Sequence, residues 1–211
     1  MSDILLKALG QTIIMVFFST VFSIILGFVP AIILIVTEPN GLKPNKFIYK
    51  ILDTIINILR SFPFIILMVF MVPLTRLIVG KSTGIQGAIV PLTIAAAPFV
   101  ARIIESALKE VDPGVVEAAK SFGASNTQLI FKVMLKEAVP SIISGLTLTV
   151  ISIIGYSAMA GSVGGGGLGD LAIRYGYQRY QTDVMIVTVL ILIIIVQVLQ
   201  SLGNYLYKKL S

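Results

Sequence analysis

The side chains that most often carry out catalysis or bind metals are missing from this sequence. It contains no histidine and no cysteine, which removes the commonest general base, the commonest metal ligand and every thiolate. Neither an acidic residue nor a lysine lies in the middle of an apolar block. This excludes a Ser–Lys hydrolase within the membrane and the buried carboxylate that ion-driven carriers use. We therefore expect no enzyme, and no cofactor or metal of the chain's own.

Two glycine motifs resemble nucleotide-binding sequences but occur in the wrong context. Gly80-Lys81-Ser82 matches the end of a phosphate-binding loop, which also needs a glycine at the position that Thr75 occupies. Gly164-x-Gly166-x-x-Gly169 matches a dinucleotide fingerprint, which must follow a β-strand, whereas this copy follows an apolar helix. We therefore expect that the chain itself does not hydrolyse ATP or bind a dinucleotide.

The chain as a whole has the composition of a membrane protein. Of its 211 residues, 56% are hydrophobic and only 12% are charged, and the mean hydropathy is +0.99. The apolar residues form blocks of roughly 20, the helical length that crosses a hydrocarbon core of about 30 Å. We predict a single all-α membrane domain over 1–211 with five transmembrane helices at about 12–37, 53–77, 85–104, 138–163 and 184–207.

Two details of this assignment concern its first two blocks. Six spans would result if the second block were two short segments, because Pro63 and Pro73 could interrupt it. Residues 1–10 lack the basic run and cleavage site of a signal peptide, so we expect the first block to be retained as a helix.

Basic residues are distributed unequally between the two faces that five spans create. Eleven of the sixteen lysines and arginines fall on the face with 38–52, 105–137 and the C-terminus. The positive-inside rule places that face in the cytoplasm and the N-terminus outside. The net charge of +6 is thus explained by helix-flanking cations, and we expect the lipid bilayer as a partner and no nucleic acid.

The long polar segment 105–137, between the third and fourth blocks, contains two helix-start signals. Asp112 and Pro113 are a good N-cap and first helical residue, and Ser125 with Gln128 forms a capping-box pattern. Gly123 between them can end the first helix in a left-handed turn. We predict two short amphipathic helices that meet at this glycine. Their apolar faces are Val115, Val116, Ala119 and Phe122, and Leu129, Ile130, Val133 and Met134.

Such a pair of helices permits two interpretations. It could lie on the membrane surface, as basic amphipathic helices do. It could instead project into the cytoplasm and dock in a groove of a partner protein.

This segment resembles the EAA loop of binding-protein-dependent ABC importers, whose permease subunits use it to dock on the ATPase. Glu117, Ala118, Ala119 and Gly123 match the core of that motif, and Pro140 matches its distal proline. The chain departs from the pattern at Lys136, where many members carry a proline. The resemblance implies a coupling helix on the cytoplasmic side.

Further segments resemble the permeases of methionine importers: 60–66, 96–102, 155–161, 164–169 and 175–177. The resemblance implies a type I importer fold and a homodimer in the cytoplasmic membrane of a prokaryote. It also implies an extracytoplasmic binding protein or lipoprotein, and two ATPase subunits that hold ATP and magnesium. Methionine, as the L- and also the D-isomer, is the expected substrate. The alternatives are another amino acid or small solute, or a channel or secondary carrier without an ATPase.

Small residues recur in the fourth block and have two explanations. Five spans make a poor pore wall, whereas two copies give ten spans around a two-fold axis. On that interpretation Tyr156, Ser157, Met159 and Gly161 are candidates to line the translocation path. The alternative is close helix packing within one subunit, to which the Gly161-x-x-x-Gly165 pair is suited.

Overall fold

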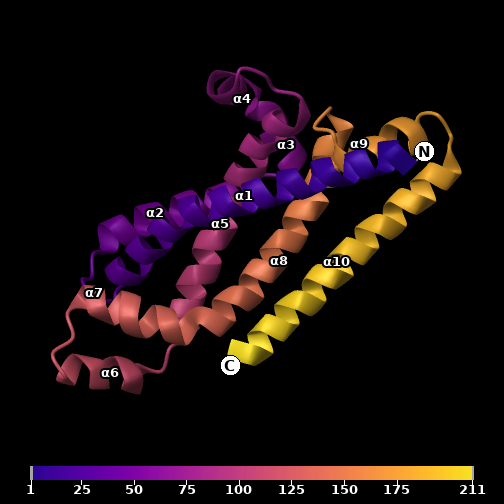
Figure 1. Cartoon of the computed structure of the whole chain (residues 1–211). Coiled ribbons are helices and arrows are strands. Elements are labelled where there is room, and N and C mark those ends of the chain that lie inside the picture. Colours follow the sequence, from indigo (N-terminus) through magenta and orange to yellow (C-terminus); the bar gives the residue numbers. More distant parts are fainter. Residues whose placement is uncertain (1, 211) are drawn as a thin grey trace.

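The computed structural model describes residues 2–210 and places almost all of them in helices (Figure 1). Residues 1 and 211, which the predicted domain includes, lie outside the described range. The helices are α1 Ser2–Thr37, α2 Lys46–Arg60, α3 Phe64–Phe70, α4 Val72–Val79, α5 Gly84–Lys109, α6 Pro113–Ser121, α7 Asn126–Gln128, α8 Leu135–Ser162, α9 Gly167–Leu171 and α10 Thr182–Leu210. Two π-helical segments, η1 Leu129–Met134 and η2 Ala172–Tyr177, follow α7 and α9.

Helix α1 is the longest element and forms one wall of the molecule (Figure 1). It begins at Ser2, earlier than the predicted start near Thr12, because residues 2–11 continue the same helix beyond the apolar block. Pro30 lies inside it without ending it. The helix packs along α5, which is the most buried of the long helices.

The second apolar block is a broken helix, so the expectation of one continuous span over 53–77 is wrong. Helices α2 and α3 meet at 101° across Ser61–Pro63. Pro63 is the N-cap of α3, and a proline both lacks an N–H and keeps the preceding residue out of the helical conformation. Helix α2 begins at Lys46, capped by Asn45, which is before the predicted start of the second span at about residue 53.

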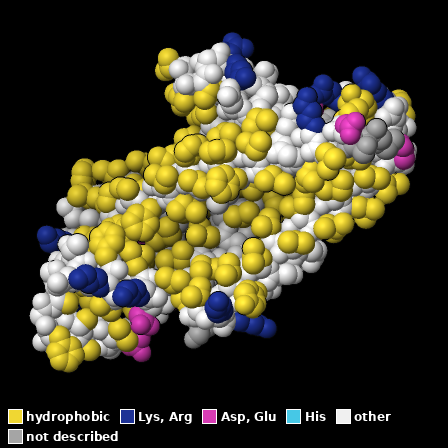
Figure 2. All heavy atoms as spheres, viewed as in Figure 1, with side chains coloured by type: hydrophobic (Ala, Val, Ile, Leu, Met, Phe, Trp, Pro, Cys, Tyr) yellow, Lys and Arg dark blue, Asp and Glu magenta, His cyan; other side chains and the backbone are white. Residues whose placement is uncertain are grey.

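Counting spans by length and apolar composition gives four among residues 2–210, or five if the bent α2–α3 pair counts as one. The four are α1, α5, the helix that includes α8, and α10. With the bent pair, the fold is the predicted five-span all-α membrane protein. Figure 2 shows an apolar band between two ends at which most of the visible charged side chains gather.

The glycine-rich run after α8 leads directly into the short helix α9. Gly166 and Gly167 both have φ near +80° and turn the chain back into the protein. Helix α9 then packs between α1 and α8, with Leu168 fully buried. Gln11 Oε1 and Thr12 Oγ1 of α1 accept hydrogen bonds from the first two backbone N–H groups of α9, at 2.9 and 2.8 Å. The exposed residues of this segment therefore lie on both sides of α9, at 162–164 before it and mainly from 174 onward after it.

Candidate functional site

The short helix α6 begins where the sequence indicates. Asp112 Oδ1 accepts a hydrogen bond from the N–H of Gly114 at 2.6 Å, and Pro113 is the first helical residue. The missing N–H of proline costs nothing there, because the first N–H groups of a helix have no partner within it. Asp112 thus fixes the start of α6 directly after α5 and Val111.

Gly123 ends α6 in the left-handed conformation, with φ +81°. The N–H of Ala124 donates to the carbonyl of Ala119 at 3.1 Å, and that of Gly123 to the carbonyl of Lys120 at 2.9 Å. This pair of bonds is the Schellman motif, in which a glycine avoids the steric penalty of a positive φ. No heavy atom lies within 4 Å of where a Cβ on Gly123 would be. The glycine is therefore required by the backbone and not by lack of space.

The second predicted helix begins where expected but is the start of a much longer helix. Ser125 and Gln128 form the capping box reciprocally, at 3.3 and 2.9 Å. Helix α7 then continues through η1 into α8 without a break, so the expectation of a separate short helix is wrong. Pro140 lies inside α8, half-buried, and outside the exposed segment. The Lys136 carbonyl that Pro140 cannot bond belongs to an exposed residue, which leaves it accessible to solvent.

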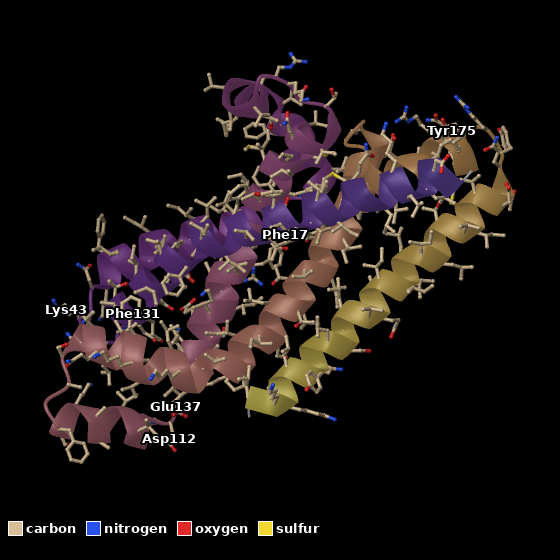
Figure 3. All side chains as sticks on the ribbon, in the orientation of Figure 1. Phe17, Lys43, Asp112, Phe131, Glu137 and Tyr175 are labelled. Carbon is tan, nitrogen blue, oxygen red and sulfur yellow. The ribbon has the colours of Figure 1, made fainter. Side chains whose placement is uncertain are left out.

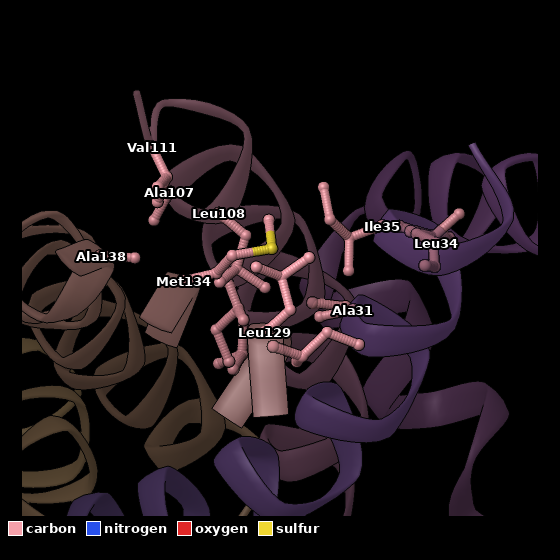
Figure 4. Packing of buried hydrophobic residues seen from close by; sticks show 14 residues of the cluster. Ala31, Leu34, Ile35, Ala107, Leu108, Val111, Leu129, Met134 and Ala138 are labelled. Carbon is pink, nitrogen blue, oxygen red and sulfur yellow. The ribbon is translucent and has the colours of Figure 1, made fainter. Parts of the chain in front are cut away.

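A buried apolar cluster holds η1, the part that follows α7, against the neighbouring helices. Leu129, Ile130 and Met134 pack against α1 and α5, and Leu129 is fully buried (Figure 4). The cluster includes Ala31, Leu34 and Ile35 of α1 and Ala107, Leu108 and Val111 at the end of α5. Phe131 adds a ring contact with Phe28 at 6.3 Å. Because shortening a buried leucine typically costs about 2–5 kcal/mol of folding stability, this cluster is expected to stabilise the packing of η1 against α1 and α5.

Helix α6 itself presents most of its surface to the outside. Val116 and Ala119 pack against the cluster, whereas Glu117 and Ala118 are exposed. Phe122 is 91% exposed. The predicted apolar face of Val115, Val116, Ala119 and Phe122 is therefore only half right, because Val115 and Phe122 point away from the protein.

A network of charged side chains joins three helices beside this segment. Arg102 of α5 donates to Glu105 at 2.7 Å and to Asp53 of α2 at 2.6 Å. Lys109 lies 2.9 Å from Glu105 and 2.9 Å from Glu38, which follows α1. Glu105 is only 1% exposed and has both cations as partners. A carboxylate buried this deeply is tolerated because it is paired twice.

Two neutral groups complete the charge network. Tyr49 OH lies 3.4 Å from both Glu105 Oε1 and Lys109 Nζ, and Asn57 Oδ1 accepts from Arg102 at 3.1 Å. Arg102 and Glu105 are three residues apart on one helix, a spacing at which side chains meet. The partners on α1 and α2 carry no local sequence signal and were missed. Figure 3 shows that Lys43, Asp112 and Glu137 lie toward one end, hereafter the α6 end, and Tyr175 at the other.

The four candidates for the translocation path fall into two pairs. Tyr156 stacks on Phe64 of α3, with ring centroids 4.8 Å apart, and Met159 is 45% exposed. Ser157 is buried, and its hydroxyl donates to the carbonyl of Ile154 at 2.7 Å. Gly161 packs against α9, where an added Cβ would lie 2.2 Å from the N of Asp170. The placement of Ser157 and Gly161 favours packing within the subunit, the alternative that the sequence also allowed.

The chain belongs to the family described as binding-protein-dependent transport system inner membrane component, whose model matches residues 23–211. Membership identifies a permease subunit and not a catalytic one.

Named relatives and solved structures narrow the similarity. The chain is 51% identical over its whole length to a probable D-methionine transport system permease protein of Vibrio cholerae, covering 93% of that protein. It is 44% identical to the methionine import system permease protein of Bacillus subtilis, over 82% of this chain and 78% of the relative. A chain of a methionine ABC transporter solved in inward-facing conformations superposes with a TM-score of 0.98 at 42% identity, covering 100% of this chain and 98% of that one.

Proposed function

We propose that this chain is the permease subunit of an ATP-driven importer of methionine in the cytoplasmic membrane of a prokaryote. The observation that carries the proposal is the match over the full chain to a methionine transporter subunit, at 42% identity and a TM-score of 0.98. Two relatives named for methionine transport, from Vibrio cholerae and Bacillus subtilis, support the substrate.

The exposed face of α6 is the proposed docking site for the ATPase. The exposed residues of this face are Glu117, Ala118 and Phe122, and the segment that carries them packs against α1, α5 and α8. A displacement of α6 should therefore also displace the transmembrane helices, because no loose loop separates them. The face combines charged and polar residues with one exposed ring, which suits a protein groove better than the interior of a lipid layer.

The proposed assembly has two copies of this chain, two ATPase subunits that hold ATP and magnesium, and an extracytoplasmic binding protein or lipoprotein. The α6 end faces the cytoplasm together with the C-terminus, and the N-terminus faces outward, as the distribution of basic residues indicates. The binding protein contacts the outer end, where residues after α9 such as Arg174 and Tyr177 are exposed.

The direct test is uptake of radiolabelled methionine into proteoliposomes that contain this chain, its copurifying ATPase and the binding protein. We expect uptake that requires ATP and that unlabelled methionine, of all amino acids in a panel, competes most strongly. ATP-dependent uptake of a different solute would retain the importer and contradict the substrate. Flux that persists without ATP or the ATPase would contradict the whole proposal.

A further inference from the structure

An apolar groove of about 620 Å³ lies between α1, α4 and α5. Its wall on α1 extends from Ile14 to Leu26, and its wall on α5 extends from Ile85 to Ile94. At about 1.5 Å per residue these two stretches are roughly 18 and 14 Å long, which is close to half of a hydrocarbon core of about 30 Å. The groove therefore has the depth of one membrane leaflet.

The two long walls run in the same direction, so the groove has an outer and an inner end. The hydroxyl of Ser19 donates to the carbonyl of Ile89 at 3.5 Å, and a Cβ on Gly27 would lie 2.6 Å from the carbonyl oxygen of Ala97. Both helices begin at the outer face in the proposed orientation. The groove therefore opens into the outer leaflet, with Ile14 and Ile85 nearest to the headgroups.

The lining of the groove is apolar except for Gln86 and Thr93. Lipid tails are as apolar as these side chains, so a tail that enters the groove gains close packing and no hydrophobic transfer free energy. The groove can therefore order a tail that is already in the bilayer. Its lining alone does not choose between one lipid and another.

Two basic side chains lie at the outer end of the groove. Arg76 is three residues before Val79 on α4, and Lys81 is in the short link from Val79 to Ile85, two residues that both line the groove. Both cations are exposed, and within residues 2–210 neither pairs with a carboxylate. Arg76 Nε donates to the hydroxyl of Ser82 at 3.3 Å. Figure 2 shows basic side chains beside apolar surface in the region of α4.

We propose that this groove is a binding site for an anionic phospholipid of the outer leaflet. One acyl chain lies along α1 and α5, and the phosphate group meets Arg76 and Lys81. The exposed amide of Gln86, at the outer end of the lining, can donate to an ester carbonyl of the lipid. The groove fixes the position of the lipid, and the two cations select its charge. The inference uses the proposed orientation and does not depend on the transported substrate.

A second copy of this chain is the other occupant that an apolar groove in a membrane protein can have. Its outer face carries more basic than acidic side chains, namely Lys7, Arg76, Lys81, Arg174 and Arg179 against Asp3, Asp170 and Asp183. A partner span would therefore cover the apolar lining without a surplus of carboxylates for the two cations. A phospholipid supplies both the apolar tail and the negative charge, which is why we favour it.

The experiment identifies the occupant by photo-crosslinking in the assembled transporter. Phe22, which lines the groove and is 44% exposed, is replaced by p-benzoylphenylalanine. The matched control has the same replacement at Phe17, which lies on α1 outside the groove and is 61% exposed. Each permease–ATPase complex is placed in nanodiscs of phosphatidylethanolamine with phosphatidylglycerol as the minor lipid. After illumination, the intact mass of this subunit shows which molecule has been attached.

Phosphatidylglycerol adducts should be enriched at position 22 and should follow the bulk lipid composition at position 17. A basic residue near an anionic headgroup favours association about fivefold, so we expect an enrichment of about fivefold or more. The double variant Arg76→Gln with Lys81→Gln should return the ratio at position 22 to that at position 17. Arg179→Gln, an exposed change between η2 and α10, should leave the enrichment unchanged. An unchanged melting temperature confirms that each variant is folded.

Three results would overturn the proposal. Equal phosphatidylglycerol fractions at positions 17 and 22 would show that the groove holds bulk lipid without selection. Adducts at position 22 with the mass of a second permease chain would assign the groove to the subunit interface. Enrichment that survives the loss of both cations would show that charge does not select the lipid. The measurement records attached mass and not uptake, so its failure leaves the proposed import of methionine untouched.

Discussion

Arg102 and Asp53, 49 residues apart in the chain, lie 2.6 Å apart and fasten α5 to α2. Helix α2 ends at the bend before Pro63, and α5 leads directly into α6. The ion pair therefore ties the proposed coupling helix to the bent span. Through Glu105 and Lys109 the same network reaches Glu38 at the end of α1. Movement of α6 is expected to carry α2 with it.

Asp53→Asn is predicted to lower the thermal stability of the complex. The asparagine keeps the shape but removes the charge that faces Arg102, which keeps Glu105 as its remaining anionic partner. Both side chains are partly exposed, so solvent screens the pair. We expect a loss of about 1 kcal/mol, seen as a fall of a few degrees in the melting temperature.

Glu105→Gln is predicted to destabilise the complex more than Asp53→Asn does, because this carboxylate is buried and faces two cations. Its loss leaves Arg102 and Lys109 close together with less compensation, and the fall should exceed that of Asp53→Asn. Lys50→Gln, an exposed change on α2, is the control and should not alter the melting temperature. Equal melting temperatures for Glu105→Gln and the wild type would show that the network is not structural.

Gly123→Val is predicted to leave membrane insertion intact and to abolish ATP-dependent uptake. Space is available for the side chain, but φ +81° is strained for a β-branched residue. The turn should then reopen and misdirect α6 relative to α8. The measurement compares membrane-extracted protein, copurified ATPase and methionine uptake.

Gly123→Asn separates backbone strain from the mere loss of glycine. Asparagine tolerates the left-handed region better than other residues with a side chain, so this variant should retain much more uptake than Gly123→Val. Equal loss in the two variants would mean that the glycine serves close approach of the partner instead of the turn.

Phe122→Ala is predicted to weaken binding of the ATPase without affecting the fold. The ring is 91% exposed, so its removal leaves no cavity in this chain. Buried aromatic anchors in protein interfaces typically contribute about 2–4 kcal/mol. We expect less ATPase to copurify while the melting temperature of the isolated permease is unchanged.

Phe47→Ala provides the matched control for this prediction. Phe47 is 75% exposed on α2 and lies outside the proposed docking face. Its truncation should not reduce copurification of the ATPase. If Phe47→Ala and Phe122→Ala weaken the complex equally, general loss of apolar surface explains the effect and the docking face must be moved.

The local signals in the sequence were sufficient to predict the ends of α6. Asp112, Gly123 and the Ser125–Gln128 capping box act through hydrogen bonds to backbone groups within a few residues. Such interactions depend on the order of residues alone. The number of apolar blocks likewise follows from composition and length.

Features that depend on tertiary neighbours could not be predicted in this way. The orientation of α6 depends on how α5 and η1 place it. As a result Val116 faces the protein, whereas Phe122 of the same predicted face points outward. The partners Glu38 and Asp53 meet Lys109 and Arg102 only because α1, α2 and α5 are packed side by side. Pro63 was noticed as a possible break, but a proline in a membrane helix can equally be accommodated as a kink.

Gly161→Ala is predicted to destabilise the subunit, because helix α8 touches α9 at this point. An added Cβ would lie 2.2 Å from the N of Asp170 and 2.5 Å from the carbonyl carbon of Gly169, and backbone atoms cannot move aside as a flexible side chain can. Helix α9 must shift, which disturbs its contacts with Gln11 and Thr12 of α1. Overpacking of this kind typically costs about 1–3 kcal/mol, measurable as a lower melting temperature.

Gly155→Ala, on the same helix, is the matched control. No heavy atom lies within 4 Å of its added Cβ, and alanine favours the helix by about 0.5–1 kcal/mol over glycine. The two substitutions should therefore shift the melting temperature in opposite directions. If Gly161→Ala is instead neutral, α9 is not seated against α8 in the assembled transporter. Gly161 would then be open toward the partner subunit, and the path-lining role that the sequence allowed would regain support over helix packing.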